Sequence, residues 1–255
     1  MNVRILLMRI AYGIEKKRQE LASKDKLEDL KKLYSSNLPE IKNLNTPGFW
    51  DKIYSENLTL GDQDSMTRDR IKTAVNFISK RELKILDIGA GMGFIEELII
   101  KEKDKEIYAN DFSEVSVAYL KKNFKGRFSK QSIYKLEYPQ KFFDVILVLE
   151  ILEHIPPSKI FKVLKSISKL LKSNGTLIVS VPMNEGLENM KYNPSGHVRM
   201  YSKDLIKAEL EIAGFKVIEY KTLFAFNNLY KIKTAIAKVL KTHKPNNIIL
   251  KARKT

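Results

Sequence analysis

Short apolar runs alternate with helix-like stretches along the middle of the chain. The runs are continuous, as in strands buried on both faces of a parallel sheet. The stretches between them place apolar residues three or four positions apart, which is typical of amphipathic helices. The predicted strands are Lys84 to Ile88, Glu106 to Asn110, Arg127 to Lys130, Phe143 to Leu149, Thr176 to Val181, Phe215 to Tyr220 and Asn247 to Ala252. The predicted helices are Met66 to Ser79, Met92 to Lys101, Ser113 to Asn123, Ser158 to Leu171 (closed by Asn174-Gly175), 203 to 213 and Asn228 to Lys241.

This alternation predicts an α/β fold, in which a doubly wound, mostly parallel seven-stranded sheet carries helices on both faces. A ligand is expected at the carboxyl ends of the strands, near the point where the strand order reverses. A charged, helical N-terminal cap is expected over residues 1–60, ahead of one domain over residues 61–255. The apolar start from Met1 to Ala11 carries Arg4 and Arg9 and has no small-residue cleavage site, so a helix is expected there and not a signal peptide.

Composition limits the classes of protein to which the chain can belong. Its 255 residues include no cysteine, which excludes disulfides, thiolate zinc sites and cysteine nucleophiles. No apolar run approaches the roughly 20 residues of a membrane span, and a cytoplasmic protein is expected. The net charge of +16 fits either a lysine-rich solvated surface or an acidic partner such as nucleic acid or anionic lipid. For the body of the chain, the solvated surface is the favoured interpretation.

The C-terminal part of the chain is more strongly basic. From Lys221 to Thr255 there are nine lysines and arginines and no acidic residue. The helix predicted there has one apolar face, with most of its lysines elsewhere. We expect this face to cover an edge of the sheet; the alternative is peripheral docking on an anionic membrane. The apolar residues are Leu229, Ile232, Ile236, Val239 and Leu240.

A glycine-rich turn follows the first predicted strand. The stretch from Asp87 to Gly93 reads Asp-Ile-Gly-Ala-Gly-Met-Gly, and a helix-like stretch comes after it. Strand, glycine turn and helix form the geometry in which backbone approaches a bound nucleotide. A dinucleotide fingerprint needs a glycine where the chain has Phe94, which argues against a nicotinamide-dependent oxidoreductase. The observed spacing, Asp-x-Gly-x-Gly-x-Gly, resembles the first motif of the class I S-adenosylmethionine-dependent methyltransferases.

Four further stretches resemble the same family, in the same order. Asp111-Phe112-Ser113 resembles the end of its second strand. Phe143 to Ile155 resembles the fourth strand and following turn of the methyltransferases that include the ubiquinone-pathway O-methyltransferases, and Lys172 to Pro182 resembles the start of their fifth strand. Gly196 to Ser202 resembles the approach to their next helix. The resemblance, over Lys84 to Val217, implies a Rossmann-like fold, methyl transfer, and S-adenosylmethionine as the cofactor.

The resemblance places the cofactor site at the strand ends. Glycines let the backbone approach the methionine part and the ribose without an intervening Cβ, and Asp111 can accept both ribose hydroxyls. In the family, the loop after the third strand often contacts adenine with an acid, whereas this chain has Ser132 and Ile133, and a serine can still hydrogen-bond. The residues expected to bind the cofactor are Asp87, Gly89, Ala90, Gly91, Gly93, Asp111, Phe112, Ser132, Ile133 and Glu150.

Acidic and histidine residues follow the predicted fourth strand. Glu150, Glu153 and His154 are spaced i, i+3 and i+4, which puts them on one face if the turn is helical. Two carboxylates and an imidazole can hold a divalent cation such as magnesium, with His197 as a fourth ligand. This pattern resembles the magnesium site of small-RNA 2′-O-methyltransferases. The alternative is a structural role for Glu153 and His154 that is shared across the wider family.

Methyl transfer to an oxygen of a small-molecule, glycan or lipid-linked acceptor is therefore expected. Without a metal, His154 or His197 is the expected general base, since His243 lies in the basic tail. RNA 2′-O-methylation is an alternative, although no RNA-binding module accompanies the domain. A non-catalytic cofactor-binding scaffold is another, against which the complete set of Asp87, glycines and Asp111 argues. The oligomeric state stays open.

The acceptor side of the site is the least determined by the sequence. The long stretch from Pro182 to Met200 is expected to be functional. Tyr192, Arg199 and Tyr201 are expected to line the acceptor side, although a salt bridge within the protein is the commoner role for an arginine. Trp50, the only tryptophan, is either a core anchor for the N-terminal helices or a wall of the pocket.

Overall fold

One mixed sheet runs through the part of the chain that the structure, a computed structural model, describes: residues 24–32, 43–56, 64–102, 104–185 and 195–255. Its seven strands within these residues are β1 (Lys84–Ile88), β2 (Glu106–Asp111), β3 (Arg127–Lys130), β4 (Phe143–Leu149), β5 (Leu171–Pro182), β6 (Phe215–Leu223) and β7 (Asn247–Lys254). The strand order is β3-β2-β1-β4-β5-β7-β6. The pairs from β3 to β5 are parallel, and β7 is antiparallel to both of its neighbours, which confirms the predicted doubly wound, mostly parallel sheet.

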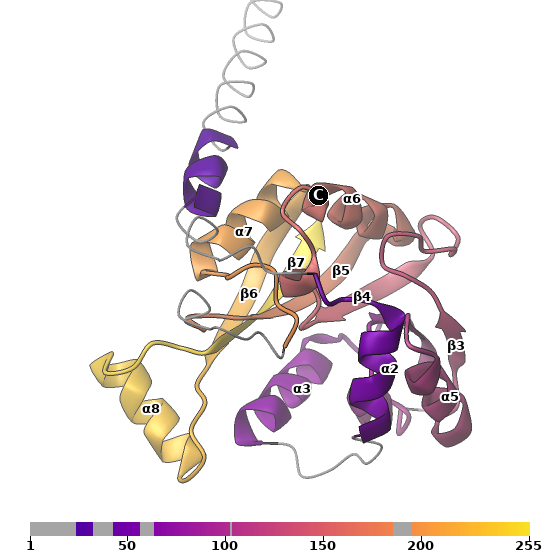
Figure 1. The fold of residues 1–255 in the computed structure, drawn as a ribbon, viewed down its shortest axis with the longest axis horizontal. Helices are drawn as coiled ribbons and strands as arrows, with labels where there is room; N and C mark the ends of the chain where they lie inside the picture. Colours follow the sequence, from indigo (N-terminus) through magenta and orange to yellow (C-terminus); the bar gives the residue numbers. More distant parts are fainter. Residues whose placement is uncertain (1–23, 33–42, 57–63, 103, 186–194) are drawn as a thin grey trace, which may run out of the picture.

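Helices cover both faces of this sheet, with α6 and α7 on one side and α2, α3 and α5 on the other (Figure 1). Among the described residues, no helix combines the length and the apolar composition needed to cross a membrane. The described helices are α2 (Pro47–Glu56), α3 (Ser65–Phe77), α4 (Phe94–Ile99), α5 (Glu114–Asn123), the 3-10 turn η1 (Leu152–His154), α6 (Ile160–Leu170), α7 (Lys203–Ile212) and α8 (Tyr230–Leu240).

The central strands are apolar throughout because both of their faces are buried. Successive side chains of a strand point to opposite faces of the sheet. In β4, Val145 and Leu147 accordingly pack with α3 and α4, whereas Ile146 and Val148 pack with α6 and α7. The continuous apolar runs in the sequence follow from this double coverage.

Local patterns predicted the first strands closely, and the region around β5 less well. β1, β3 and β4 have the predicted bounds. The helix predicted to reach Leu171 and to end at Asn174-Gly175 instead ends at Leu170, and β5 begins at Leu171. The pairing of β4 with β5 shifts register between Phe143 and Val145, because Leu171 and Thr176 both pair while the residues between them bulge out. Asn174 takes a left-handed φ of +60° in this bulge, where the turn was expected.

The N-terminal cap is described only in part. The helix expected at Met1 to Ala11 lies outside the described residues, as does much of the predicted functional stretch from Pro182 to Met200. Residues 24–32 are helical, and Leu27 is buried in the same apolar layer as α6 and α7. The division into a cap over residues 1–60 and a domain over 61–255 therefore stays a prediction.

Gly93 has a packing role that leads to a stability prediction. It precedes α4 with φ +80°, and a Cβ added there would lie 2.4 Å from the Phe124 ring and 2.9 Å from Leu120. Left-handed strain and overpacking cost about 1–3 kcal/mol each. The two costs total about 2–6 kcal/mol, and we therefore expect Gly93→Ala to lower the melting temperature by about 4–24 °C, since 1 kcal/mol corresponds to roughly 2–4 °C at this chain length.

The measurement is thermal unfolding followed by circular dichroism. Gly48→Ala, in the first turn of α2, is the matched control, because nothing lies within 4 Å of its added Cβ. Equal melting temperatures for the Gly93→Ala variant and the wild type would contradict the packing role.

Candidate functional site

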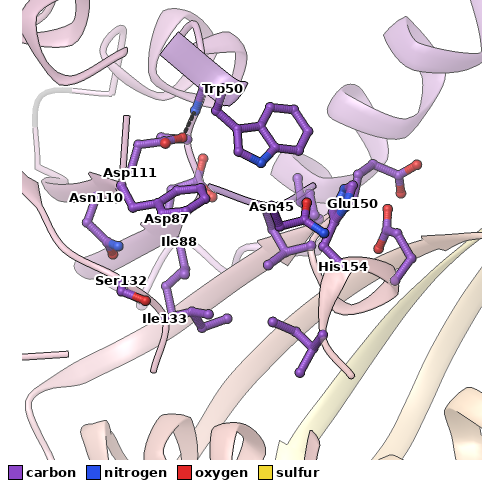
Figure 2. A pocket seen from close by; sticks show the side chains of 18 of the residues that line it. Asn45, Trp50, Asp87, Ile88, Asn110, Asp111, Ser132, Ile133, Glu150 and His154 are labelled. Atoms are coloured by element: carbon purple, nitrogen blue, oxygen red, sulfur yellow. Dashed lines mark hydrogen bonds between the residues drawn. The ribbon is translucent and has the colours of Figure 1, made fainter. Parts of the chain in front are cut away.

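A cavity opens at the carboxyl ends of β1, β2 and β4, beside α2 (Figure 2). Its volume of ≈ 620 Å³ lies within the range of small-molecule sites, about 300–1,000 Å³. The strand order reverses between β1 and β4, so the cavity occupies the position where doubly wound sheets bind ligands. The structure brings together the residues predicted to bind the cofactor, act as the base or hold a metal, except Gly93, which packs against Phe124. The predicted residues that line the cavity are Asp87, Gly89, Ala90, Gly91, Asp111, Phe112, Ser132, Ile133, Glu150, Glu153, His154 and His197.

Backbone hydrogen bonds fasten the glycine turn to the end of β2. The amides of Gly89 and Ala90 donate to the carbonyl oxygen of Asn110, at 2.8 and 3.2 Å. The amide of Gly91 donates to Oδ2 of Asp111, at 3.0 Å. The turn after β1 and the acid at the end of β2 therefore form one rigid unit at the cavity.

The carboxylate of Asp111 is buried but well supplied with donors. Its Oδ1 accepts the amide of Ser113 at 2.9 Å. Burial raises the pKa of Asp111, and the amides of Ser113 and Gly91 oppose that rise. The hydroxyl of Tyr54, on α2, also hydrogen-bonds to this carboxylate, and burial together with Asp111 raises the pKa of Tyr54 well above its usual value. Sequence reasoning missed Tyr54, although it ends the aromatic stretch that begins at Phe49.

Helix α2 forms one wall of the cavity. Trp50 lines the cavity and meets the His154 ring edge-to-face, with 5.1 Å between ring centroids. This contact decides between the two predicted roles of Trp50 in favour of the pocket wall. Asp51 fixes the helix to the start of α5, because its Oδ1 accepts the Ser113 hydroxyl at 2.5 Å and the Val115 amide at 3.3 Å.

Buried carboxyl groups give the region around the glycine turn an affinity for positive charge. Burial, and then the charge of Asp111, raises the pKa of Asp87 to about 7. Glu96, on α4, is fully buried without a hydrogen-bond partner among the described residues, and burial followed by Asp87 raises its pKa well above the usual value. A cation near Asp87 would favour its charged form. The site therefore fits S-adenosylmethionine, which carries a sulfonium and an ammonium group.

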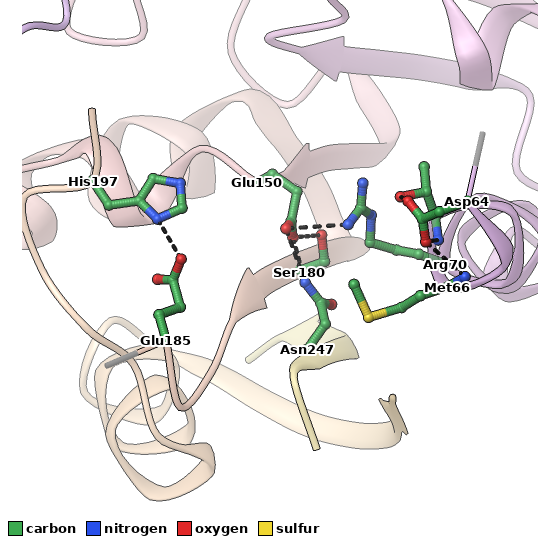
Figure 3. Close-up of polar contacts among 9 residues, drawn as sticks. Asp64, Met66, Arg70, Glu150, Ser180, Glu185, His197 and Asn247 are labelled. Atoms are coloured by element: carbon green, nitrogen blue, oxygen red, sulfur yellow. Dashed lines mark hydrogen bonds and ion pairs between the residues drawn. The ribbon is translucent and has the colours of Figure 1, made fainter. Parts of the chain in front are cut away.

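Glu150 lines the cavity, but its carboxylate is held by three other elements (Figure 3). It accepts the Ser180 hydroxyl of β5 at 2.6 Å and the Asn247 amide of β7 at 2.8 and 3.0 Å. The guanidinium of Arg70, on α3, lies 3.1 Å away. None of these three partners was predicted from the sequence.

The condition under which Glu150, Glu153 and His154 would share one helical face is not met, because the helical turn does not include Glu150. Residue 150 takes a left-handed φ of +56°, and the 3-10 turn begins only at Leu152. Among the described residues, the side chains whose potential ligand atoms converge are Glu153, His154 and His197, all within 4.8 Å of one another. Glu150 lies outside this group because of the contacts just described.

The converging group combines an isolated carboxyl group with two imidazoles. Both carboxyl oxygens of Glu153 are buried without a hydrogen-bond partner among the described residues. Burial, and then Glu150, raises the pKa of Glu153 well above its usual value. Burial, and then His197, lowers the pKa of His154 to about 4, so this imidazole is neutral near pH 7. One carboxylate and two imidazoles are ligands that suit a divalent transition metal better than magnesium.

His197 is oriented by a residue that the sequence did not single out. Its Nδ1 lies 2.7 Å from Oε1 of Glu185, just after β5 (Figure 3). Its ring meets that of His154, with 4.8 Å between centroids. The only signal for Glu185 was its place in the long stretch predicted to be functional.

Arg199 and Tyr201 do not line the acceptor side, contrary to expectation. Both are buried, and both bind the carboxylate of Glu209 on α7. The salt bridge within the protein is thus the role that the structure supports for Arg199. Tyr192 lies outside the described residues.

Comparisons with known proteins agree with this geometry. A family model described as a methyltransferase domain matches residues 63–220. An uncharacterized protein of Methanocaldococcus jannaschii is 28% identical over 172 residues, which are 66% of this chain and 72% of the relative. The ubiquinone biosynthesis O-methyltransferase of Pelagibacter ubique is 33% identical over 115 residues, 43% of this chain and 45% of the relative, so the match spans less than half of that protein.

A solved structure gives the same fold. The 1,6-didemethyltoxoflavin-N1-methyltransferase of Burkholderia thailandensis, solved with 1,6-didemethyltoxoflavin and S-adenosylhomocysteine bound, has a TM-score of 0.62. The alignment covers 85% of this chain and 92% of that one, at 16% identity. At this identity the likeness concerns the fold alone.

Proposed function

Because the chain belongs to the methyltransferase-domain family, as a class I S-adenosylmethionine-dependent methyltransferase, we propose that it methylates an oxygen of a small-molecule or lipid-linked acceptor. The observation that carries this proposal is the pair of Glu185 and His197 at the cavity, which suits removal of a proton from a hydroxyl. The Pelagibacter relative is named an O-methyltransferase, which supports oxygen as the accepting atom. A cytoplasmic location stays a prediction.

The chain's own residues hold the cofactor and position the acceptor. When bound, S-adenosylmethionine supplies a methyl group already activated on its sulfonium. Asp111 would accept the ribose hydroxyls, which requires the Tyr54 hydroxyl to leave this carboxylate. Ser132 and Ile133 would face the adenine. Figure 2 shows Asp87 and Asp111 on one side of the cavity and His154 on the other, which separates the cofactor end from the acceptor end.

His197 is the better of the two candidate bases. Glu185 can accept its Nδ1–H and stabilise the imidazolium that forms when Nε2 takes the acceptor's proton. His154 is a weaker base, since burial lowers its pKa to about 4. With Trp50, it would instead shape the acceptor side of the cavity and exclude water.

A divalent cation at Glu153, His154 and His197 is a second candidate. The buried, unpartnered carboxyl group of Glu153 favours it, because a cation would supply the missing partner. In that case His197 would be a ligand, and the metal would lower the pKa of the acceptor hydroxyl. The RNA 2′-O-methyltransferase alternative is weaker, since the pattern it resembles includes Glu150, and that carboxylate binds Arg70, Ser180 and Asn247.

The test is transfer of a labelled methyl group to a panel of phenols, catechols and their polyprenyl-linked derivatives. We expect a methyl ether as product, because the proposed base acts on a hydroxyl. A chelator should leave turnover unchanged if His197 is the base; loss of turnover, restored by Mn²⁺ or Mg²⁺, would favour the cation. A product methylated at nitrogen or carbon, or on RNA alone, would contradict the proposal.

A further inference from the structure

The apolar side of α8 faces solvent, so the expectation that it covers the sheet edge is wrong. Val239 is 78% exposed, and its neighbours on the helix surface are also about half exposed or more. They make up five of the nine large apolar side chains exposed among the described residues. We call this set the α8 apolar face: Leu229 (67% exposed), Ile232 (58%), Ile236 (48%), Val239 (78%) and Leu240 (65%).

Contacts on the opposite side of the helix set this orientation. The buried residues of α8 are Thr234 and Ala237. The hydroxyl of Tyr230 donates to Asp69 on α3, at 3.0 Å, and Lys221 binds the other oxygen of the same carboxylate at 2.6 Å. At 3.6 residues per turn, these anchors point the α8 apolar face away from the protein. Figure 1 shows α8 standing out beyond the end of β6.

Lysines flank this face, and the segment that carries them contains no acid. No Asp or Glu occurs from Lys221 to Thr255. An apolar face bordered by lysines complements a surface that is apolar inside and negative at its rim. The exposed lysines of α8 and the turn after it are Lys231, Lys233, Lys238, Lys241 and Lys244.

We propose that α8 docks on an anionic lipid surface. Its apolar face enters the region between headgroups and acyl chains, while the lysines bind lipid phosphates. A second copy of the chain fits less well, because two such faces would bring their lysines together without an acid to pair them. An RNA would leave the apolar face without a partner. The inference rests on α8 alone. It adds a membrane as a partner of the protein, and it does not depend on the proposed methyl transfer.

The test is sedimentation of the full chain with vesicles, in the absence of cofactor and acceptor. One set of vesicles is phosphatidylcholine alone, and the other is an equal mixture of phosphatidylcholine and phosphatidylglycerol. We expect binding to the mixed vesicles only. Binding should weaken when salt rises from about 0.1 M to about 1 M, as the Debye length falls from ≈ 10 to ≈ 3 Å.

Two double variants test the two parts of the surface. Ile232→Ser with Val239→Ser should weaken vesicle binding by at least about tenfold, because it removes two side chains of the apolar face, of which Val239 is the most exposed. The control is Leu83→Ser with Ile218→Ser, two large apolar side chains away from α8 that are also exposed (44% and 46%). These substitutions are at exposed positions, so thermal unfolding should show an intact fold.

Charge reversal tests the lysines in the same assay. Lys231→Glu with Lys238→Glu should abolish the preference for anionic vesicles, whereas Lys121→Glu with Lys122→Glu, on α5, should keep it.

The proposal is overturned if the wild type binds neither kind of vesicle or binds both kinds equally. It is also overturned if the control variants lose as much vesicle binding as the α8 variants. It is also overturned if Ile232→Ser with Val239→Ser dissolves a dimer and leaves vesicle binding unchanged. Methyl transfer is measured in a separate assay. An absence of methyl transfer would contradict the proposed function, whereas vesicle binding alone tests the role of α8.

Discussion

We expect Asp111→Ala to lower the affinity for S-adenosylhomocysteine by about 100-fold or more, because the variant loses both acceptors for the ribose hydroxyls. Each hydrogen bond to a charged group contributes about 1.5–3 kcal/mol, and 1.4 kcal/mol corresponds to a factor of ten in affinity. Two such bonds amount to about 3–6 kcal/mol, so a 100-fold loss is the lower end of the expected range. Titration calorimetry of the wild type and the variant measures the difference.

Two controls separate binding from folding in this experiment. Asp104→Ala removes an exposed carboxylate between α4 and β2 and should bind like the wild type. Asp111→Asn keeps one oxygen that can accept the amide of Gly91 or Ser113. Its melting temperature should therefore fall less than that of Asp111→Ala, although it should still bind S-adenosylhomocysteine weakly. If Asp111→Ala binds within about threefold of the wild type, which is less than 1 kcal/mol, Asp111 does not hold the ribose.

We expect His197→Ala to lower kcat by about 10²- to 10⁴-fold, the usual contribution of a positioned general base. The affinity for S-adenosylhomocysteine should change little, because His197 lies on the acceptor side of the cavity. Glu185→Gln should cause a smaller loss, since an amide can still orient the ring but stabilises the imidazolium less. The measurement is turnover at saturating cofactor, with whichever acceptor of the panel reacts.

A matched histidine and chemical rescue distinguish a base from a structural residue. His243→Ala, in the exposed turn after α8, should keep full activity. Added imidazole should restore part of the activity of His197→Ala, which a residue that only supports the fold would not allow. A different result would make His197 a cation ligand instead of the base. In that case a divalent cation restores the activity of the wild type after chelation, and imidazole does not restore the activity of His197→Ala. An unchanged kcat would place the base elsewhere.

The sequence by itself determined the order of strands and helices and the cofactor end of the site. Continuous apolar runs are a local consequence of double coverage. The stretch from Asp87 to Gly93 and the acid at position 111 lie at the ends of neighbouring parallel strands, which necessarily meet at one edge of the sheet. Local pattern and parallel pairing were therefore enough to bring Asp111 within reach of the glycine turn.

Only the tertiary structure decided the acceptor end and the direction of α8. Glu150 binds a partner 97 positions away, and Tyr230 binds one 161 positions away. Such contacts depend on how distant segments pack and leave no periodic signal in the chain. Arg70, Ser180 and Asn247 hold the carboxylate of Glu150, and the anchors of α8 turned its apolar side outward. A helical pattern states which residues share a face, but packing with the rest of the protein decides which face is buried.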